Sequence, residues 1–158
     1  MPVVLAPDTG TSQWANIRAR LAVVLGAISV TSPSAENIKR VYVTPPATVE
    51  DLPCFIIYPP AVEVDRRPGG WRVNKYGPLR LRCLVRDADV AVAVDFLDAF
   101  REATIAAFDA EIRLENEATL VQSQRIDEAK AFKYGGRDYV GFDCILGVRL
   151  DEQVTYGN

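Results

Sequence analysis

The last quarter of the chain contains the segment Tyr134-Gly135-Gly136-Arg137-Asp138-Tyr139-Val140-Gly141-Phe142. This segment leads into an alternating run that ends at Leu150. From Phe142 onward, every second residue is apolar, and Asp143 and Arg149 are among the residues between them. This alternation is typical of an antiparallel strand with one buried face. Gly141 and Gly147 would allow bulges or a close approach of a neighbouring backbone. The segment therefore predicts a long strand in a sheet with one apolar face.

Further strands are predicted earlier in the chain. The run from Leu79 to Arg86 alternates between an apolar face and an arginine face: Leu79, Leu81, Cys83 and Val85 against Arg80, Arg82 and Arg86. We expect the first face to join the core and the second to be solvated or paired. The continuous apolar run Cys54–Tyr58 favours a strand covered on both faces. A shorter strand is expected at Val41–Val43, where two prolines follow.

A hairpin and two more strands complete the expected sheet. Alternating residues flank Pro68-Gly69-Gly70, which predicts an extended β-hairpin between Val62 and Lys75. The segments Glu111–Leu114 and Thr119–Ile126 are interpreted as strands joined by a turn at residues 115–117. With two main helices packed on it, this mixed, mainly antiparallel sheet gives an α+β fold.

The two helices differ in how much apolar surface they carry. The first, over residues 12–28, has apolar residues at helical spacing along one face. The second, Val90–Phe108, has only a narrow polar stripe, so its apolar residues surround most of the helix. We expect either the first helix or another subunit to cover the excess. The residues predicted for a subunit interface are Val94, Leu97, Phe100 and Ile105.

Length and composition limit the class of protein. The chain has 158 residues, of which 49% are hydrophobic and 25% charged, which suits one compact domain over residues 1–158. No apolar run approaches the length of a membrane span, and no signal peptide is recognisable, so we expect no membrane association. Cys54, Cys83 and Cys144 lie far apart in the sequence and are expected to be buried free thiols.

The formal net charge of -3 conceals two segments of opposite sign. Between residues 65 and 86, seven arginine or lysine residues accompany one acid, and between residues 109 and 128 six acids accompany two arginines. A subunit charged in this way could bind a copy of itself head to tail, and repeated contacts of that kind close into a ring or continue as a helix. The alternative is that both segments are ordinary solvated strand faces and loops.

The sequence offers little for catalysis. It contains no histidine, which excludes Ser-His-Asp and Cys-His arrangements and His-x-x-x-His zinc sites within one chain. Phosphate-binding loops and dinucleotide fingerprints are also missing from it. We therefore assign no catalytic, cofactor-binding or metal-binding residue, although a small oligomeric enzyme that uses carboxylates stays open as an alternative.

The hairpin is the best candidate for a contact site. It combines cations with an aromatic ring, and the residues predicted to contact a partner are Arg66, Arg67, Trp71 and Arg72. Tryptophan and arginine often anchor protein interfaces. The same residue types bind single-stranded nucleic acid, but an acidic protein with a pI near 5.0 would repel a phosphate backbone elsewhere. A plain exposed turn is the third interpretation.

The layout of these elements resembles the tail terminator proteins of long-tailed bacteriophages. The resemblance lies in the order of an N-terminal helix, the Leu52–Pro59 strand, the basic hairpin, the helix Val90–Phe108 and the closing Tyr139–Cys144 strand, and it covers most of the chain. It implies a virion protein, assembled in the host cytoplasm, that forms a hexameric ring on the head-proximal end of the tail tube and stops tube polymerisation.

The resemblance also implies partners. They are further copies of the chain, the tail tube protein, and a neck or head-completion protein, with no cofactor and no sequence-specific nucleic acid, even where DNA passes through the ring. A head-tail connector or neck protein of the same virion is the nearest alternative, followed by the enzyme and the nucleic-acid-binding module.

Overall fold

The computed structural model describes residues 13–87, 90–112, 114 and 119–153, and these residues contain a seven-stranded sheet. Its main path runs β3 (Arg40–Tyr42), β4 (Cys54–Ile57), β6 (Trp71–Asp87), β9 (Arg137–Gln153) and β7 (Thr119–Ile126). Beside this path, β5 (Val62–Arg67) pairs with β6 and β8 (Lys130–Tyr134) pairs with β9. β3 and β4 are parallel, and the other pairs are antiparallel. The predicted α+β class and mixed, mainly antiparallel sheet are confirmed.

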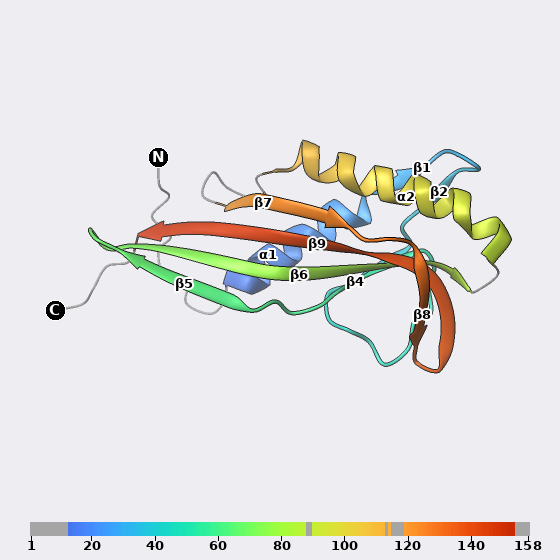
Figure 1. Ribbon diagram of the computed structural model, residues 1–158, viewed down its shortest axis with the longest axis horizontal. Coiled ribbons are helices and arrows are strands. Elements are labelled where there is room, and N and C mark those ends of the chain that lie inside the picture. Colours follow the sequence, from blue (N-terminus) through green and yellow to red (C-terminus); the bar gives the residue numbers. More distant parts are fainter. Residues whose placement is uncertain (1–12, 88–89, 113, 115–118, 154–158) are drawn as a thin grey trace.

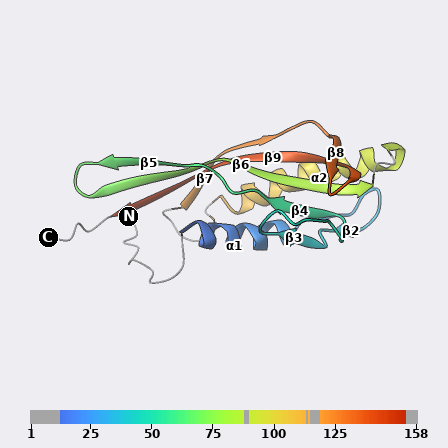
Figure 2. The same cartoon turned by 90° about the horizontal axis from the view of Figure 1, so that it is seen from below.

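Two helices build the main core together with one face of this sheet. α1 (Gln13–Gly26) contributes Leu21 and Leu25, and α2 (Val90–Ala110) contributes Phe100, all fully buried. They pack with the apolar face of β6 and β9, as their alternation predicts. A small pair of strands, β1 (Ser29–Val30) and β2 (Glu36–Asn37), follows α1. Figure 2 shows α1 running below the sheet, close to β3 and β4. Both predicted helices are thereby confirmed.

The longest strands, β6 and β9, pair from one end of the molecule to the other. Their register runs from Trp71 opposite Gln153 to Asp87 opposite Tyr139. The sequence pattern predicted a hairpin that ends at Lys75 and a separate strand that begins at Leu79. In the structure, the second strand of the hairpin continues into the strand at Leu79, and the two form β6. A register shift between Tyr76 and Leu79 accommodates the intervening Gly-Pro pair, because a bulge tolerates a residue without an N–H.

The predicted β5–β6 hairpin is present and extends past α1 (Figures 1 and 2). Gly69 and Gly70 form its turn with φ angles of 84° and 77°, which side chains other than hydrogen disfavour. Every residue of β5 is exposed. The hairpin is therefore a projecting ribbon at one end of an elongated molecule.

The opposite face of the sheet carries a second, smaller apolar cluster. Phe132 of β8 and Tyr139 of β9 pack there with Tyr42 and Ile56. The sequence treated Gly135 and Gly136 as part of an alternating strand, but they form the turn of a β8–β9 hairpin with φ angles of 57° and 80°. β8 was missed because its five residues mix lysines with apolar residues without a strict alternation, and no strong turn signal bounds them on the N-terminal side.

Two further details concern the last third of the chain. The strand predicted at Glu111–Leu114 is wrong for the described residues 111, 112 and 114, which form a turn and a bend. Leu114 is fully buried there and anchors the connection from α2, and the predicted turn at residues 115–117 lies outside the described residues. The close approach expected at Gly141 is confirmed, since a Cβ atom there would lie 1.9 Å from the carbonyl oxygen of Cys83.

Candidate functional site

The tip of the β5–β6 hairpin presents cations to solvent. Arg66 and Arg67 are exposed, and neither forms an ion pair with another described residue. Because paired residues share a face of a sheet, Arg67 lies on the same face as its partner Trp71, and Arg66 lies on the opposite face beside Arg72. Trp71 is half-buried. The hairpin therefore carries two different faces, each with one guanidinium that forms no ion pair among the described residues.

Arg72 has a role inside the chain that the sequence did not predict. Its guanidinium pairs with Glu152 of β9, whose side chain is only 5% exposed. Of the residues predicted to contact a partner, Arg66, Arg67 and Trp71 are thus available in the subunit, whereas Arg72, which lies close to the turn, is held by Glu152.

A buried polar network surrounds that ion pair. Asn74 Nδ2 donates to Glu152 Oε1 at 2.9 Å and to Gln13 Oε1 at 3.0 Å, and Gln13 Nε2 donates to Glu152 Oε2. The Tyr76 hydroxyl also donates to Gln13 Oε1, at 3.2 Å, and the Tyr76 ring stacks on Trp14 at a centroid distance of 6.2 Å. These contacts join β6, β9 and the first turn of α1, and so fix the direction in which the ribbon leaves the core.

The arginine face of β6 is also largely paired within the chain. Arg82 binds Asp143 through two hydrogen bonds, at 2.9 and 3.2 Å, and Arg80 lies 3.7 Å from the same carboxylate. Arg86 pairs with Glu36 at 3.1 Å. Burial acts to lower the pKa of the Arg82 guanidinium, but the hydrogen bond to Asp143 and the charge of that carboxylate more than offset it, so the pKa is raised. The basic segment is therefore much less basic toward a partner than its sequence indicates.

The predicted subunit-interface residues of α2 fall into two groups. Leu97 and Phe100 are 4% and 0% exposed and belong to the main core, so their placement in an interface is wrong. Val94 and Ile105 are 49% and 43% exposed, on the flank of the helix beside its buried face. α1 and β1 contact α2 and cover part of its apolar surface. Val94 and Ile105 stay predictions for a contact between subunits.

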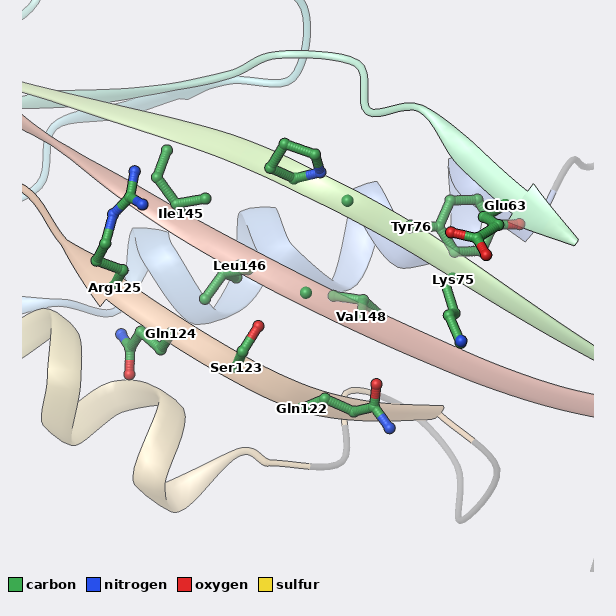
Figure 3. A pocket seen from close by; sticks show the side chains of 13 residues that line it. Glu63, Lys75, Tyr76, Gln122, Ser123, Gln124, Arg125, Ile145, Leu146 and Val148 are labelled. Atoms are coloured by element: carbon green, nitrogen blue, oxygen red, sulfur yellow. The ribbon is translucent and has the colours of Figure 1, made fainter.

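An open groove crosses the face of the sheet that points away from the helices. It has a volume of about 390 Å³, and two glycines, Gly77 and Gly147, form part of its lining. Figure 3 shows Arg125 and Ile145 at one end, Glu63 and Lys75 at the other, and Ser123 between them. Both cations are engaged within the chain, Lys75 by Asp65 at 3.8 Å and Arg125 by Asp127 at 2.8 Å. The groove is open to solvent and mixes apolar with polar side chains, and these side chains do not form a nucleophile–base pair.

A second groove lies between the helices. It has a volume of about 450 Å³ and is lined by Val23 and Val24 of α1 and by alanines of α2. The salt bridge from Arg20 to Glu111, at 3.2 Å, closes one part of its border. This groove was not predicted, because the alanines that form it count as ordinary apolar residues in a helical pattern.

The three cysteine side chains are buried, which keeps their thiols protonated and poorly nucleophilic. Burial raises the pKa of the Cys54 and Cys144 thiols to about 12 and that of Cys83 well above its ordinary value. All three are free and buried, as expected. Among the described residues, no group of histidine, cysteine or carboxylate side chains is arranged to hold a metal ion.

No protein-family model matches the sequence, and no curated protein matches it either. Within the described part of the chain, neither helix is both long and apolar enough to span a membrane.

Proposed function

We propose that this chain is the subunit of a phage tail terminator. In this role, copies of the chain form a ring, hexameric by resemblance, on the head-proximal end of the tail tube. The ring ends tube polymerisation and gives a neck or head-completion protein a surface to bind. The chain acts as a structural protein of the virion, and no chemical step is part of the role.

The observation that carries the proposal is the projecting β5–β6 ribbon. It extends beyond the helices and ends in exposed Arg66 and Arg67, and the buried network around Glu152 ties its strand β6 to β9 and α1 (Figure 1). A rigid arm loses little conformational entropy when it binds, so it suits a contact that must be repeated around an assembly. The resemblance in layout to tail terminators suggests that the partner of this arm is the tail tube protein or a neck protein.

We assign contact with the tube or neck to the face of the arm that carries Arg67 and Trp71. Arg67 and Trp71 share this face, and they combine an exposed cation with a partly exposed aromatic ring. Such residues are frequent at the centres of protein interfaces. Arg72 is left out of the contact, because Glu152 already holds its guanidinium.

A polymerisation assay tests this function. Tail tube protein from the phage that encodes the chain is allowed to polymerise with and without the purified chain, and tube lengths are measured by electron microscopy. We expect short tubes with a ring at one end. The double variant Arg67→Glu/Trp71→Ala should remain folded by circular dichroism and lose this capping.

A matched control is available on the other hairpin. Arg137 is an exposed arginine beside the β8–β9 turn, so Arg137→Glu makes the same change of charge at a site with no proposed contact. It should cap tubes as the parent does. Tubes that grow equally long with and without the parent chain, and carry no ring, would contradict the proposal.

A further inference from the structure

The groove between α1 and α2 is a mainly apolar hollow that none of the described residues fills. Val23, at its edge, is 59% exposed, and the α2 side is lined by Ala103, Ala106, Ala107 and Ala110. Because alanine side chains end at Cβ, this part of α2 leaves space that a larger side chain from elsewhere can fill. An exposed apolar hollow of this kind marks a surface for a protein contact.

The border of the groove on α2 is acidic. Glu102 and Asp109 lie one turn before and one turn after Ala106, so they flank the hollow on the solvent side of the helix. Both are exposed, and among the described residues neither forms an ion pair. Glu111, in contrast, is already paired with Arg20. A partner for this groove is therefore apolar at its centre and basic beside it.

One face of β5 has that chemistry. Val62, Val64 and Arg66 alternate along the strand and so point to the same side of the ribbon. The valines are 49% and 39% exposed, and the guanidinium of Arg66 pairs with no carboxylate among the described residues. This face lies opposite to the one that carries Arg67 and Trp71.

We propose that this β5 face of one copy docks in the α1–α2 groove of a second copy. Val62 and Val64 lie on the alanines, and Arg66 approaches Glu102 and Asp109. Within one chain the ribbon projects away from the helices, so the contact joins two different surfaces of two subunits (Figures 1 and 2). Contacts of this type repeat around a ring. The inference rests on the ring of the proposed function and names the two surfaces that build it.

Charge reversal on the two sides tests the docking. The mass of the assembly is measured by light scattering during size-exclusion chromatography, over one series of concentrations for every variant. Arg66→Glu and Glu102→Arg should each weaken association by about tenfold or more, since like charges then face each other. The double variant Arg66→Glu/Glu102→Arg should recover association, and Arg137→Glu should match the parent.

A cross-link provides a second readout that does not depend on the charges. The native cysteines are buried, so copies carrying Val64→Cys and copies carrying Ala106→Cys can be mixed with a short thiol cross-linker. A dimer band should form in the mixture and in neither variant alone.

Several results would overturn the docking. They are a parent that stays monomeric, an Arg66→Glu variant that assembles like the parent, a double variant without recovery, or a mixture that does not cross-link. Failure of the proposed function has a different signature, because association and cross-linking would then be intact while tail tubes remain uncapped.

Discussion

The buried carboxylate of Glu152 contacts Arg72, Asn74 and Gln13, and so joins the hairpin to β9 and α1. Glu152→Gln keeps the shape of the side chain but removes its charge, so Arg72 loses its counter-ion. One side-chain oxygen also becomes an NH₂ group, which must face donors from Gln13, Asn74 or Arg72. A lost charge-assisted hydrogen bond costs about 1.5–3 kcal/mol, and breaking a buried pair about 3–5 kcal/mol. Because the Arg72 side chain is 33% exposed and partly solvated, we expect about 3 kcal/mol.

Urea or thermal denaturation followed by circular dichroism measures this cost. For a chain of this size, about 3 kcal/mol corresponds to a fall of about 6–12 °C in Tm. Glu63→Gln is the matched control, since Glu63 lies on the same hairpin but is exposed, and its effect should stay within about 0.5 kcal/mol. If Glu152→Gln unfolds at the same midpoint as Glu63→Gln, the network does not hold the hairpin and the argument is wrong.

Two further predictions concern the core. Leu97→Asp should destabilise the fold by about 4 kcal/mol, because it buries an unpaired charge. Val94→Asp, at an exposed position of the same helix, should cost about 0.5 kcal/mol or less. Thermal denaturation distinguishes the two variants, and equal melting temperatures would place Leu97 outside the core. The buried thiols predict that the free energy of unfolding falls at alkaline pH. Folding raises the pKa values of Cys54 and Cys144 from 9.0 to about 12, so the stability that these thiols contribute is fully present below pH 9. Between pH 9 and pH 12 only the unfolded chain ionises, and stability falls by about 1.4 kcal/mol per pH unit for each thiol. Urea midpoints across this range should show the slope, and the double variant Cys54→Ala/Cys144→Ala should have a shallower one; an unchanged slope would contradict the assignment.

The sheet could be predicted because its signal is local. In the runs Leu79–Val85 and Phe142–Leu150, a period of two assigns each side chain to a face, and the burial of these residues follows that assignment. The β8–β9 turn was missed because Gly135 and Gly136 have apolar alternation beyond them, which made the whole segment resemble one strand.

The candidate site was only partly predictable because its contacts are distant in the sequence. Gln13 and Glu152 are separated by 139 positions, so no local pattern indicates that Arg72 is held by a buried carboxylate. Helical periodicity identified apolar positions on α2, but it could not tell which of them the chain's own sheet covers. Leu97 and Phe100 face that sheet, whereas Val94 and Ile105 do not.

The central claim is that the chain ends tail-tube polymerisation, and electron microscopy of particles made without its gene tests this most directly. The account predicts abnormally long tubes without heads, because nothing stops their growth. Filled heads beside free tails of normal length would contradict it and indicate a head-tail connector, and unchanged infectious particles would remove the tail assignment altogether.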